Sequence, residues 1–209
     1  MGSVGLHILN LIKDIVTFPP YQYSVIISLI LSDGYIQLKK DWRNAKPRSD
    51  GPQIHFEYLW SVFLILSSYC YSYPYFRYII CTGKPAHGIT LETHALLCFN
   101  ELHSLFYIDG IKIIPSDIFN LLTPPVLAHW IISDSSKHGN ELIFCIDSFT
   151  VIEVIRLMNV FIIRYGLECT LHVRNSNHHR IYIQVKLMSL LRSIVLSYMH
   201  SSMLYKIHL

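Results

Sequence analysis

The sequence predicts an α+β protein built from two similar halves, and three observations point to this class. The order helix, strands, helix, hairpin, helix occurs twice along the 209 residues. Each copy opens with an apolar helix that ends at a single acid, Asp33 in the first copy and Asp134 in the second. Hydrophobic residues make up 52% of the chain and charged residues only 15%, a composition that suits a large packed core and excludes a disordered protein.

The first half is predicted element by element from short-range patterns. Residues 21–33 are apolar, contain small side chains and end at an Asp-Gly pair, which predicts a helix. Residues 35–43 alternate in polarity and predict a strand, whereas the turn residues of 44–52 predict a polar loop. The later segments of this half are a strand end that becomes a helix at 55–71, a strand pair at 76–82 and 87–93, and a helix at 95–107.

The second half repeats this order. It opens with the apolar segment 121–134, and an amphipathic helix is predicted over 150–165 because Gly166 provides a stop. The strands and the final helix are predicted at 141–147, 168–174, 180–186 and 187–196. This duplication predicts two αββαββα repeats related by a pseudo-dyad, residues 1–115 and 116–209, whose opening helices pack against each other.

A membrane protein is the first alternative that this composition raises. The longest stretch without a charged residue runs from Tyr58 to Phe76 and is near the minimum length for a spanning helix. Its second half is rich in Ser and Tyr and contains Pro74, so only a short apolar part remains. The first residues lack the cleavage pattern of a signal peptide. We therefore expect no membrane partner, and a small membrane protein stays only as a rival hypothesis.

Charge and metal-ligand patterns narrow the function classes further. The net charge of +3 excludes a general polycation that coats nucleic acid but allows a local basic face. The five cysteines contain no CxxC pair, and the twelve histidines contain no HExxH motif. A zinc site is therefore not expected.

The two apolar helices suggest a site for a hard metal ion. Ser28 and Ser32 are small residues one helical turn apart and allow a second helix to approach closely. Such packing would bring Asp33 and Asp134 together, and two adjacent carboxylates repel each other unless a cation lies between them. Mg²⁺ prefers oxygen ligands and, between carboxylates and phosphate oxygens, supports phosphodiester hydrolysis.

Two segments carry a resemblance to a known family. Residues 26–36 (IISLILSDGYI) and 122–139 (LTPPVLAHWIISDSSKHG) resemble the two signature helices of the LAGLIDADG homing endonucleases. The second segment has the context LTPxxLAxW, and the similarity extends over nearly the whole chain. More narrowly, the chain resembles the single-chain, two-repeat branch that is encoded by mitochondrial introns.

This resemblance implies a fold, an activity and four catalytic positions. The fold has a paired LAGLIDADG helix interface and two antiparallel β saddles, and the activity is site-specific double-strand cleavage of DNA for intron homing. Asp33 and Asp134 match the metal-binding acids, with Mg²⁺ as cofactor and Mn²⁺ or Ca²⁺ able to substitute. Lys112, ahead of an Ile-Ile-Pro, and Lys206, in the tail Met-Leu-Tyr-Lys, match lysines near the scissile phosphates. The resemblance also implies a mitochondrial monomer that binds a long, asymmetric duplex site.

In this fold, alternate side chains of the hairpins face the major groove of the DNA. The candidate readers of base edges are Gln37, Lys39, Arg43, Thr90, Glu92, Arg174, His178, Arg180, Tyr182, Gln184 and Lys186. Arg77, Lys84 and Lys137 are expected to contact phosphates instead, which positions the protein without specifying a sequence.

One departure from the family pattern leaves two further functions open. Ser135 follows Asp134 where the family normally has glycine, so we expect a strain of about 1 kcal/mol if the left-handed conformation of that glycine is kept. The segment 44–52 is also atypical for this branch. A degenerate homing endonuclease that binds DNA without cutting it, and an RNA-binding maturase that helps its host intron RNA to fold, are therefore alternatives to the nuclease.

Overall fold

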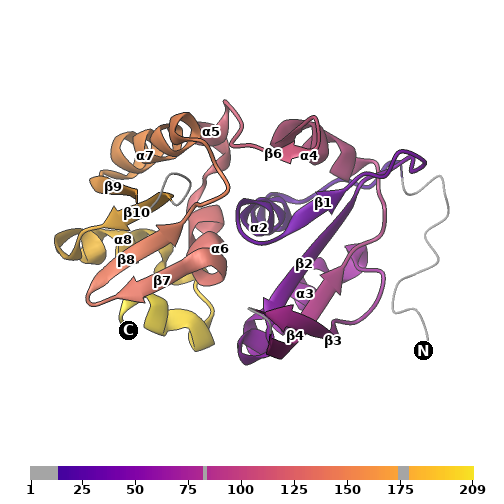
Figure 1. Ribbon diagram of the computed structural model, residues 1–209, viewed down its shortest axis with the longest axis horizontal. Coiled ribbons are helices and arrows are strands. Elements are labelled where there is room, and N and C mark those ends of the chain that lie inside the picture. Colours follow the sequence, from indigo (N-terminus) through magenta and orange to yellow (C-terminus); the bar gives the residue numbers. More distant parts are fainter. Residues whose placement is uncertain (1–13, 82–83, 174–178) are drawn as a thin grey trace. The chain divides into compact units, whose positions relative to one another are not determined.

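The computed structural model describes residues 14–81, 84–173 and 179–209 and forms two compact units, Met1–Leu105 and Phe106–Leu209. Each unit contains one four-stranded antiparallel sheet and its own helices (Figure 1). The strand orders are β1-β2-β4-β3 and β7-β8-β10-β9, so both sheets have the same topology. The predicted α+β class is confirmed. The repeat boundary after Pro115 stays a prediction about the sequence repeats.

In the described residues of the first unit, three helices and four strands follow the predicted order closely. They are α2 (Pro20–Leu31), β1 (Tyr35–Gln37), β2 (Lys46–Pro52), α3 (Phe56–Leu66), β3 (Tyr75–Cys81), β4 (Lys84–Glu92) and α4 (Cys98–Phe106), with 3₁₀ turns at Gln53–His55 and Ser67–Tyr69. The strand pair β3–β4 and the three helices match their predictions to within a few residues. The predicted strand end at the start of the 55–71 segment is wrong, because the chain enters α3 through a 3₁₀ turn.

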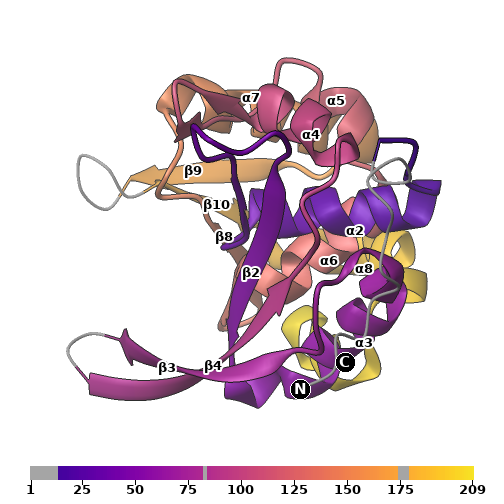
Figure 2. The ribbon, with the colours of Figure 1, turned by 90° about the vertical axis from the view of Figure 1, so that its right-hand side faces the viewer.

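Helix α2 forms the centre of the core of the first unit. Its residues Ser24 to Leu31 are all buried, as expected of a helix that is apolar on every side. Figure 2 shows α2 running across the strands of the sheet. The Gly34 N–H donates to the Leu29 carbonyl oxygen at 2.9 Å, and a Cβ at Gly34 would lie 2.3 Å from that oxygen. Glycine is therefore required where the chain leaves this helix.

Strand β2 corrects the prediction of a polar loop over residues 44–52, and the strand predicted over 35–43 ends at Gln37 instead. Side chains alternate between the two faces of a strand, and β2 places the charged Lys46, Arg48 and Asp50 on one face. Pro47, Ser49 and Gly51 occupy the other face, toward the core. Since β2 contains no large apolar side chain, its sequence shows none of the alternation that predicts a strand.

The second unit begins with a small hairpin that the sequence did not predict. Strands β5 (Tyr107–Ile108) and β6 (Ile111–Lys112) are joined through Asp109 and Gly110, which both have positive φ angles, of 50° and 77°. This turn is typical of a two-residue β-hairpin. Because this hairpin begins at Tyr107, helix α4 ends at Phe106, one residue before its predicted end.

The rest of the second unit agrees well with the predictions. Its elements are α5 (Ile118–Leu121), α6 (Pro124–Asp134), β7 (Ser135–His138), β8 (Glu141–Cys145), α7 (Val151–Tyr165), β9 (Cys169–Val173), β10 (His179–Ile183) and α8 (Met188–Val195), followed by a 3₁₀ segment at Ser201–Ile207. Only α5, β7 and the last segment were not predicted. Helix α7 is capped at both ends, by a Thr150–Glu153 capping box and by Gly166 at φ 65°, as the predicted stop requires.

Aromatic packing holds the core of the second unit together. Trp130 of α6 lies 4.6 Å from Phe144 of β8, ring centre to ring centre, and Phe144 lies 5.3 Å from Phe161 of α7. All three side chains are fully buried. Rings at these separations attract each other beyond the burial of their surface, so the sheet, α6 and α7 are fixed relative to one another. Across the described part of the chain, no helix combines the length and the apolar character needed to span a bilayer.

Candidate metal and nucleic-acid site

The two predicted metal-binding acids occupy different local positions. Asp134 is the last residue of α6 and is half-buried, whereas Asp33 lies two residues beyond the end of α2 and is exposed. The Trp130 indole Nε1 donates to Asp134 Oδ2 at 3.3 Å. Because Trp130 is itself fixed in the aromatic core, this contact orients the Asp134 carboxylate.

Ser135 does not adopt the strained conformation that the sequence predicted. Its backbone is extended, with φ −90° and ψ 154°, and it begins strand β7. The Ser135 hydroxyl donates to the Ile131 carbonyl oxygen at 2.6 Å, which helps to satisfy the end of the helix. The expected left-handed residue is therefore wrong, since the chain passes directly from α6 into a strand and needs no left-handed turn there.

Lys206 lies beside the Asp134 end of α6. Its side chain is buried, and its Nζ donates to the Ser135 carbonyl oxygen at 2.7 Å. The structure thus places the Lys206 ammonium group on the carbonyl oxygen of the residue that follows Asp134. Lysine is rarely buried without a role that holds it there.

Lys112, the other predicted lysine, lies at the end of β6 and is half-buried. The chain that follows it is anchored on α7. Glu153 accepts the Ile114 N–H at 2.8 Å, and Arg156 donates to the Ile114 carbonyl at 2.6 Å. This clamp fixes the segment that carries Lys112. It belongs to the second unit, whereas Asp33 belongs to the first.

A buried histidine on α6 was not predicted from the sequence. His129 is 3% exposed, and burial, together with the nearby His200, lowers its pKa to about 4. It is therefore neutral at pH 7. The sequence did not indicate this burial, because no motif around a single histidine in an apolar helix shows whether its side chain is buried or exposed.

The chemistry of the two predicted metal ligands, one in each unit, fits a hard divalent cation. Both candidate ligands are carboxylates, and the described residues contain no group of three His, Cys, Asp or Glu side chains that could hold a metal. Zinc sites use three or four protein ligands rich in nitrogen and sulfur. Mg²⁺ instead binds one or two carboxylates and completes its shell with water and substrate phosphates. The residues present suit Mg²⁺ and do not suit zinc.

The outer face of the first sheet carries a network of paired charges. Glu92 accepts from Lys46 Nζ at 3.0 Å and from Arg48 Nη1 at 3.0 Å, and Arg48 also pairs with Asp50 at 3.3 Å. Burial alone would raise the pKa of Glu92, but the bonds and charges of Lys46, Tyr75 and Arg48 together hold it below its usual value. The network fixes the Lys46 and Arg48 side chains in place. Neither residue was among the predicted readers, because the sequence predicts a loop where β2 lies.

The predicted readers of the first unit fall into two groups. Gln37 is on β1 opposite Lys46, while Thr90 and Glu92 are on β4 and bonded to Asp50, Lys46 and Arg48. Lys39 and Arg43 lie outside the sheet: Lys39 Nζ is 4.7 Å from the centre of the Trp42 ring, and Arg43 pairs with Asp14 at 2.8 Å. Their placement on a strand was wrong. Of the phosphate candidates, Arg77 is exposed on β3 and Lys84 begins β4.

In the second unit, only part of the predicted hairpin surface is on a strand. Arg180 and Tyr182 are on β10, with the Tyr182 ring stacked 4.1 Å from His172 of β9. Gln184 and Lys186 lie beyond β10, and Lys186 pairs with Glu168 at 3.1 Å, so the strand predicted to reach Lys186 is too long. Lys137 is exposed on β7. Arg174 and His178 lie outside the described residues.

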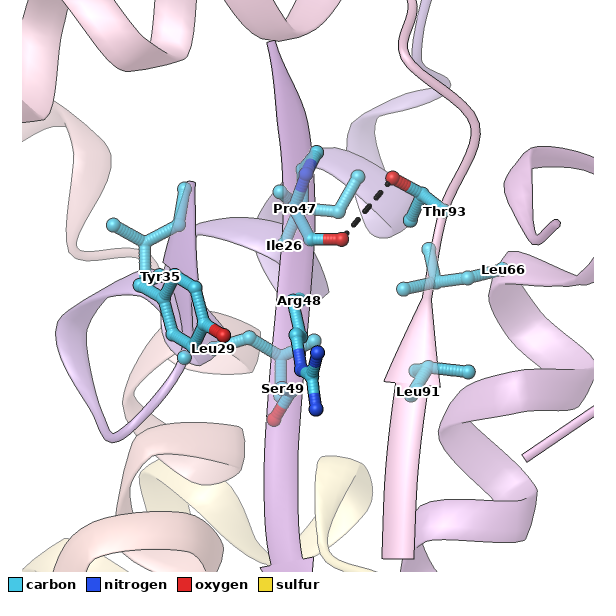
Figure 3. Close-up of a pocket in the computed structure, with 11 residues that line it drawn as sticks. Ile26, Leu29, Tyr35, Pro47, Arg48, Ser49, Leu66, Leu91 and Thr93 are labelled. Carbon is cyan, nitrogen blue, oxygen red and sulfur yellow. Dashed lines mark hydrogen bonds between the residues drawn. The ribbon is translucent and has the colours of Figure 1, made fainter. Parts of the chain in front are cut away.

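A small cavity lies on the core side of the charged sheet. Its volume is about 20 Å³, and it is enclosed by α2, β2 and β4 (Figure 3). The lining is mostly apolar, and Thr93 donates to the Pro47 carbonyl at 3.3 Å beside it. A space of this size accommodates one water molecule at most. It is part of the packing below the site and too small for a ligand.

A comparison with protein families matches residues 23–191 to the LAGLIDADG DNA endonuclease family. Among curated relatives, the cytochrome b mRNA maturase bI2 of Debaryomyces hansenii is 33% identical over 60% of this chain and 48% of its own length. Its Saccharomyces cerevisiae counterpart is 28% identical over 88% of this chain and 46% of its own length. The intron-encoded endonuclease ai4 of Dictyostelium discoideum is 31% identical over 55% of this chain and 74% of its own length.

The chain thus spans about half the length of these two maturases. Among solved structures, the homing endonuclease I-WcaI bound to its DNA recognition sequence is similar, with a TM-score of 0.85 and 25% identity over 92% of this chain and 88% of that chain. I-DmoI in complex with DNA and Mn shares the fold at a TM-score of 0.54 and 10% identity, over 85% of this chain and 97% of that chain.

Proposed function

Because this chain belongs to the LAGLIDADG DNA endonuclease family, we propose that it is a site-specific endonuclease that cuts both strands of an intron-homing site in a metal-dependent reaction. One observation carries the proposal. Asp134 ends its signature helix with its carboxylate oriented by Trp130, and the buried Lys206 is bonded to the next residue. An acid and a cation that are held together in this way suit the stabilisation of a phosphoryl transition state.

In this proposal, the four predicted catalytic residues have two roles, metal binding and stabilisation of charge on the phosphate. Asp33 and Asp134 would hold Mg²⁺, which when bound supplies Lewis acidity at the scissile phosphates. Lys206 and Lys112 would neutralise charge that develops on the phosphate oxygens or polarise the attacking water. The pairing of α2 with α6, which would join the two acids, is part of the same proposal.

The structure of Ser135 supports an active nuclease over a degenerate one. One of the two reasons to suspect decay was a serine in a left-handed turn beside Asp134; the other was the atypical segment 44–52. Since Ser135 is extended and hydrogen-bonded, it gives no cause for Asp134 to be displaced. The serine is compatible with the helix end found here.

Duplex DNA is the proposed substrate, recognised by the outer faces of the two sheets. I-WcaI, the relative with a TM-score of 0.85, was solved bound to its DNA recognition sequence. In this chain the ion-pair network of Lys46, Arg48, Glu92 and Asp50 holds charged side chains in fixed positions on the first sheet. We further propose that the protein acts as a monomer in mitochondria, in line with its resemblance to the intron-encoded branch.

The test is cleavage of a plasmid that carries the intron-insertion site. With Mg²⁺, the wild-type chain should yield linear DNA, and Asp134→Asn and Asp33→Asn should each reduce cutting by at least about a hundredfold, an electrostatic loss of roughly 3 kcal/mol. Asp117→Asn is the matched control, since Asp117 is an exposed acid remote in sequence from both helix ends. Duplex binding without any cleavage, with Mg²⁺ or Mn²⁺, would contradict the nuclease.

An RNA maturase is the second candidate, because the two curated relatives described above are named cytochrome b mRNA maturases. The two activities are separable in one competition assay. Host intron RNA should displace labelled duplex DNA only weakly if the nuclease proposal is right. Preferential binding of the intron RNA, together with faster splicing in vitro, would favour the maturase.

A further inference from the structure

The first unit has a second concave site that the proposed nuclease reaction does not use. Its volume is about 520 Å³, within the range of ligand sites. The walls carry the rings of Trp42, Tyr71 and His94 and the charged groups of Asp14, Asp41, Arg43 and Lys46. All of these residues belong to the first unit.

Two of the aromatic rings each have a lysine ammonium group close to them. Lys46 Nζ is 5.3 Å from the centre of the Tyr71 ring, and Lys39 Nζ is 4.7 Å from the centre of the Trp42 ring. The Tyr71 ring is 54% exposed and meets the His94 ring edge-on at 5.5 Å. Tyr71 is exposed and Trp42 is half-buried. Accessible flat rings beside lysines are the combination that binds a stacked base and its phosphate.

The walls are held in place by hydrogen bonds from neighbouring elements. Asn100 of α4 accepts the Ala45 N–H at 2.6 Å and donates to the Arg43 carbonyl at 3.2 Å, which fixes the segment bearing Trp42. On the other side, the Tyr71 N–H donates to the Glu92 carbonyl at 3.0 Å, and the His94 N–H donates to the Tyr69 carbonyl at 2.7 Å. A pocket braced on both sides is pre-organised, which reduces the entropy lost on binding.

We propose that this pocket binds one unpaired nucleotide of a single-stranded nucleic acid. The base would stack on Trp42 and Tyr71. Its phosphate would compete with Asp14 for Arg43 and with Glu92 for Lys46, because these carboxylates pair with the two cations in the free protein. A paired base lies inside the duplex stack and cannot enter such a pocket without being flipped out. The exposed carboxylate of Asp41 is an acceptor only, so bases with an exocyclic amine, adenine, cytosine and guanine, are favoured over uracil and thymine.

The inference rests on the proposed function in one respect. Lys46 belongs both to this pocket and, through its bond to Glu92, to the charged outer face of the first sheet. A nucleic acid that follows that face therefore reaches the mouth of the pocket. An unpaired nucleotide next to a duplex, as in a frayed DNA end or an RNA loop, matches this arrangement.

Fluorescence anisotropy with labelled homopolymers tests the proposal on the full chain. Oligo-A, oligo-C and oligo-U in RNA form, oligo-A, oligo-C and oligo-T in DNA form, and a duplex are titrated at one salt concentration. Trp42→Ala and Tyr71→Ala should each weaken oligo-A binding roughly ten- to a hundredfold, the effect of losing one stacked base. Duplex binding and cleavage should change by less than about twofold. Tyr78→Ala, at an exposed tyrosine outside the pocket, is the control and should change neither.

The remaining outcomes separate this proposal from the nuclease. Asp41→Asn should remove the preference for oligo-A and oligo-C over oligo-U, and the RNA and DNA series show which single strand is bound. Equal losses for single strands and duplex in Trp42→Ala would overturn the proposal, because the pocket would then be part of the duplex surface. Unchanged oligo-A binding in both ring variants would also overturn it, whether or not the wild-type chain cuts its target.

Discussion

His129 shows how one residue can make the stability of the second unit depend on pH. Its pKa is lowered to about 4 by burial and by the nearby His200, whereas an unfolded histidine titrates near pH 6.5. Between these values the unfolded chain binds the proton more readily than the folded chain. The free energy of unfolding therefore falls as the pH drops from about 6.5 to about 4, by about 3 kcal/mol in all.

Replacing His129 with leucine should remove most of this dependence. Urea unfolding of wild type and His129→Leu, followed by circular dichroism between pH 7 and pH 4, measures it. The free energy of unfolding of the variant should be flatter with pH, because the titrating group is gone and an apolar side chain fills the site. His87→Leu, at an exposed position on β4, should keep the wild-type slope; equal slopes in all three proteins would refute the assignment.

Exchange of the residue that follows Asp33 or Asp134 should destabilise the fold, but to different degrees. Ser135→Gly is expected to destabilise the fold by about 1 kcal/mol, because it removes the bond to Ile131 and adds backbone freedom. A strained Ser135 would have given the reverse, a gain in stability. Gly34→Ser should be the more harmful change, by about 2 kcal/mol or more, since its Cβ would meet the Leu29 carbonyl at 2.3 Å. Thermal unfolding of wild type and the two variants measures which substitution lowers the stability more.

Strand β2 is the element whose stability depends on ion pairs more than on apolar burial. Glu92→Gln keeps the size of the side chain but leaves Lys46 and Arg48 without their shared counter-ion. We expect the free energy of unfolding to fall by about 1–2 kcal/mol at pH 7. Because the pKa of Glu92 is lowered in the folded state, its contribution is present above pH 4.5 and is lost as the pH falls through the folded pKa.

The difference between wild type and Glu92→Gln should therefore shrink in acid. Guanidinium would screen the ion pairs, so urea melts at pH 7 and pH 3.5 are the suitable measurement. Glu57→Gln, at an exposed glutamate in the first turn of α3, serves as the matched control. A difference of the same size at both pH values would show that the charge of Glu92 is not what stabilises β2.

Elements were predictable from the sequence wherever their burial is one-sided and apolar. Helix α7 carries an amphipathic pattern, a capping box and Gly166 as its stop, so its bounds were found closely. Strand β2 was missed because its pattern reflects charge pairing with β4, which is distant in the sequence. Asp134 is a prediction from its motif, whereas the extended Ser135 and the bond from Lys206 depend on how β7 and the C-terminal segment pack. Such contacts have no local sequence signal.

At the scale of the whole molecule, the net charge is low, so the affinity for DNA should depend on where each lysine and arginine lies. The affinity of the chain for duplex DNA should fall with salt in proportion to the number of phosphates that it neutralises. Arg77→Ala, at an exposed position on β3, should lower the slope of log affinity against log salt by about one. Lys186→Ala should lower it less, because Glu168 already pairs with Lys186. Identical slopes in all three proteins would remove Arg77 from the DNA contacts.

The two sheets described above have the same strand order, and no strand of one pairs with a strand of the other in the described parts of the chain. This has a consequence for synthesis. The last strand of the first sheet ends at Glu92, so every pairing of that sheet is available before most of the second unit has left the ribosome. Domains generally fold as units during translation, the N-terminal one first. The first signature helix can therefore be buried and its exit turn set at Gly34 while the codons for Asp134 are still unread.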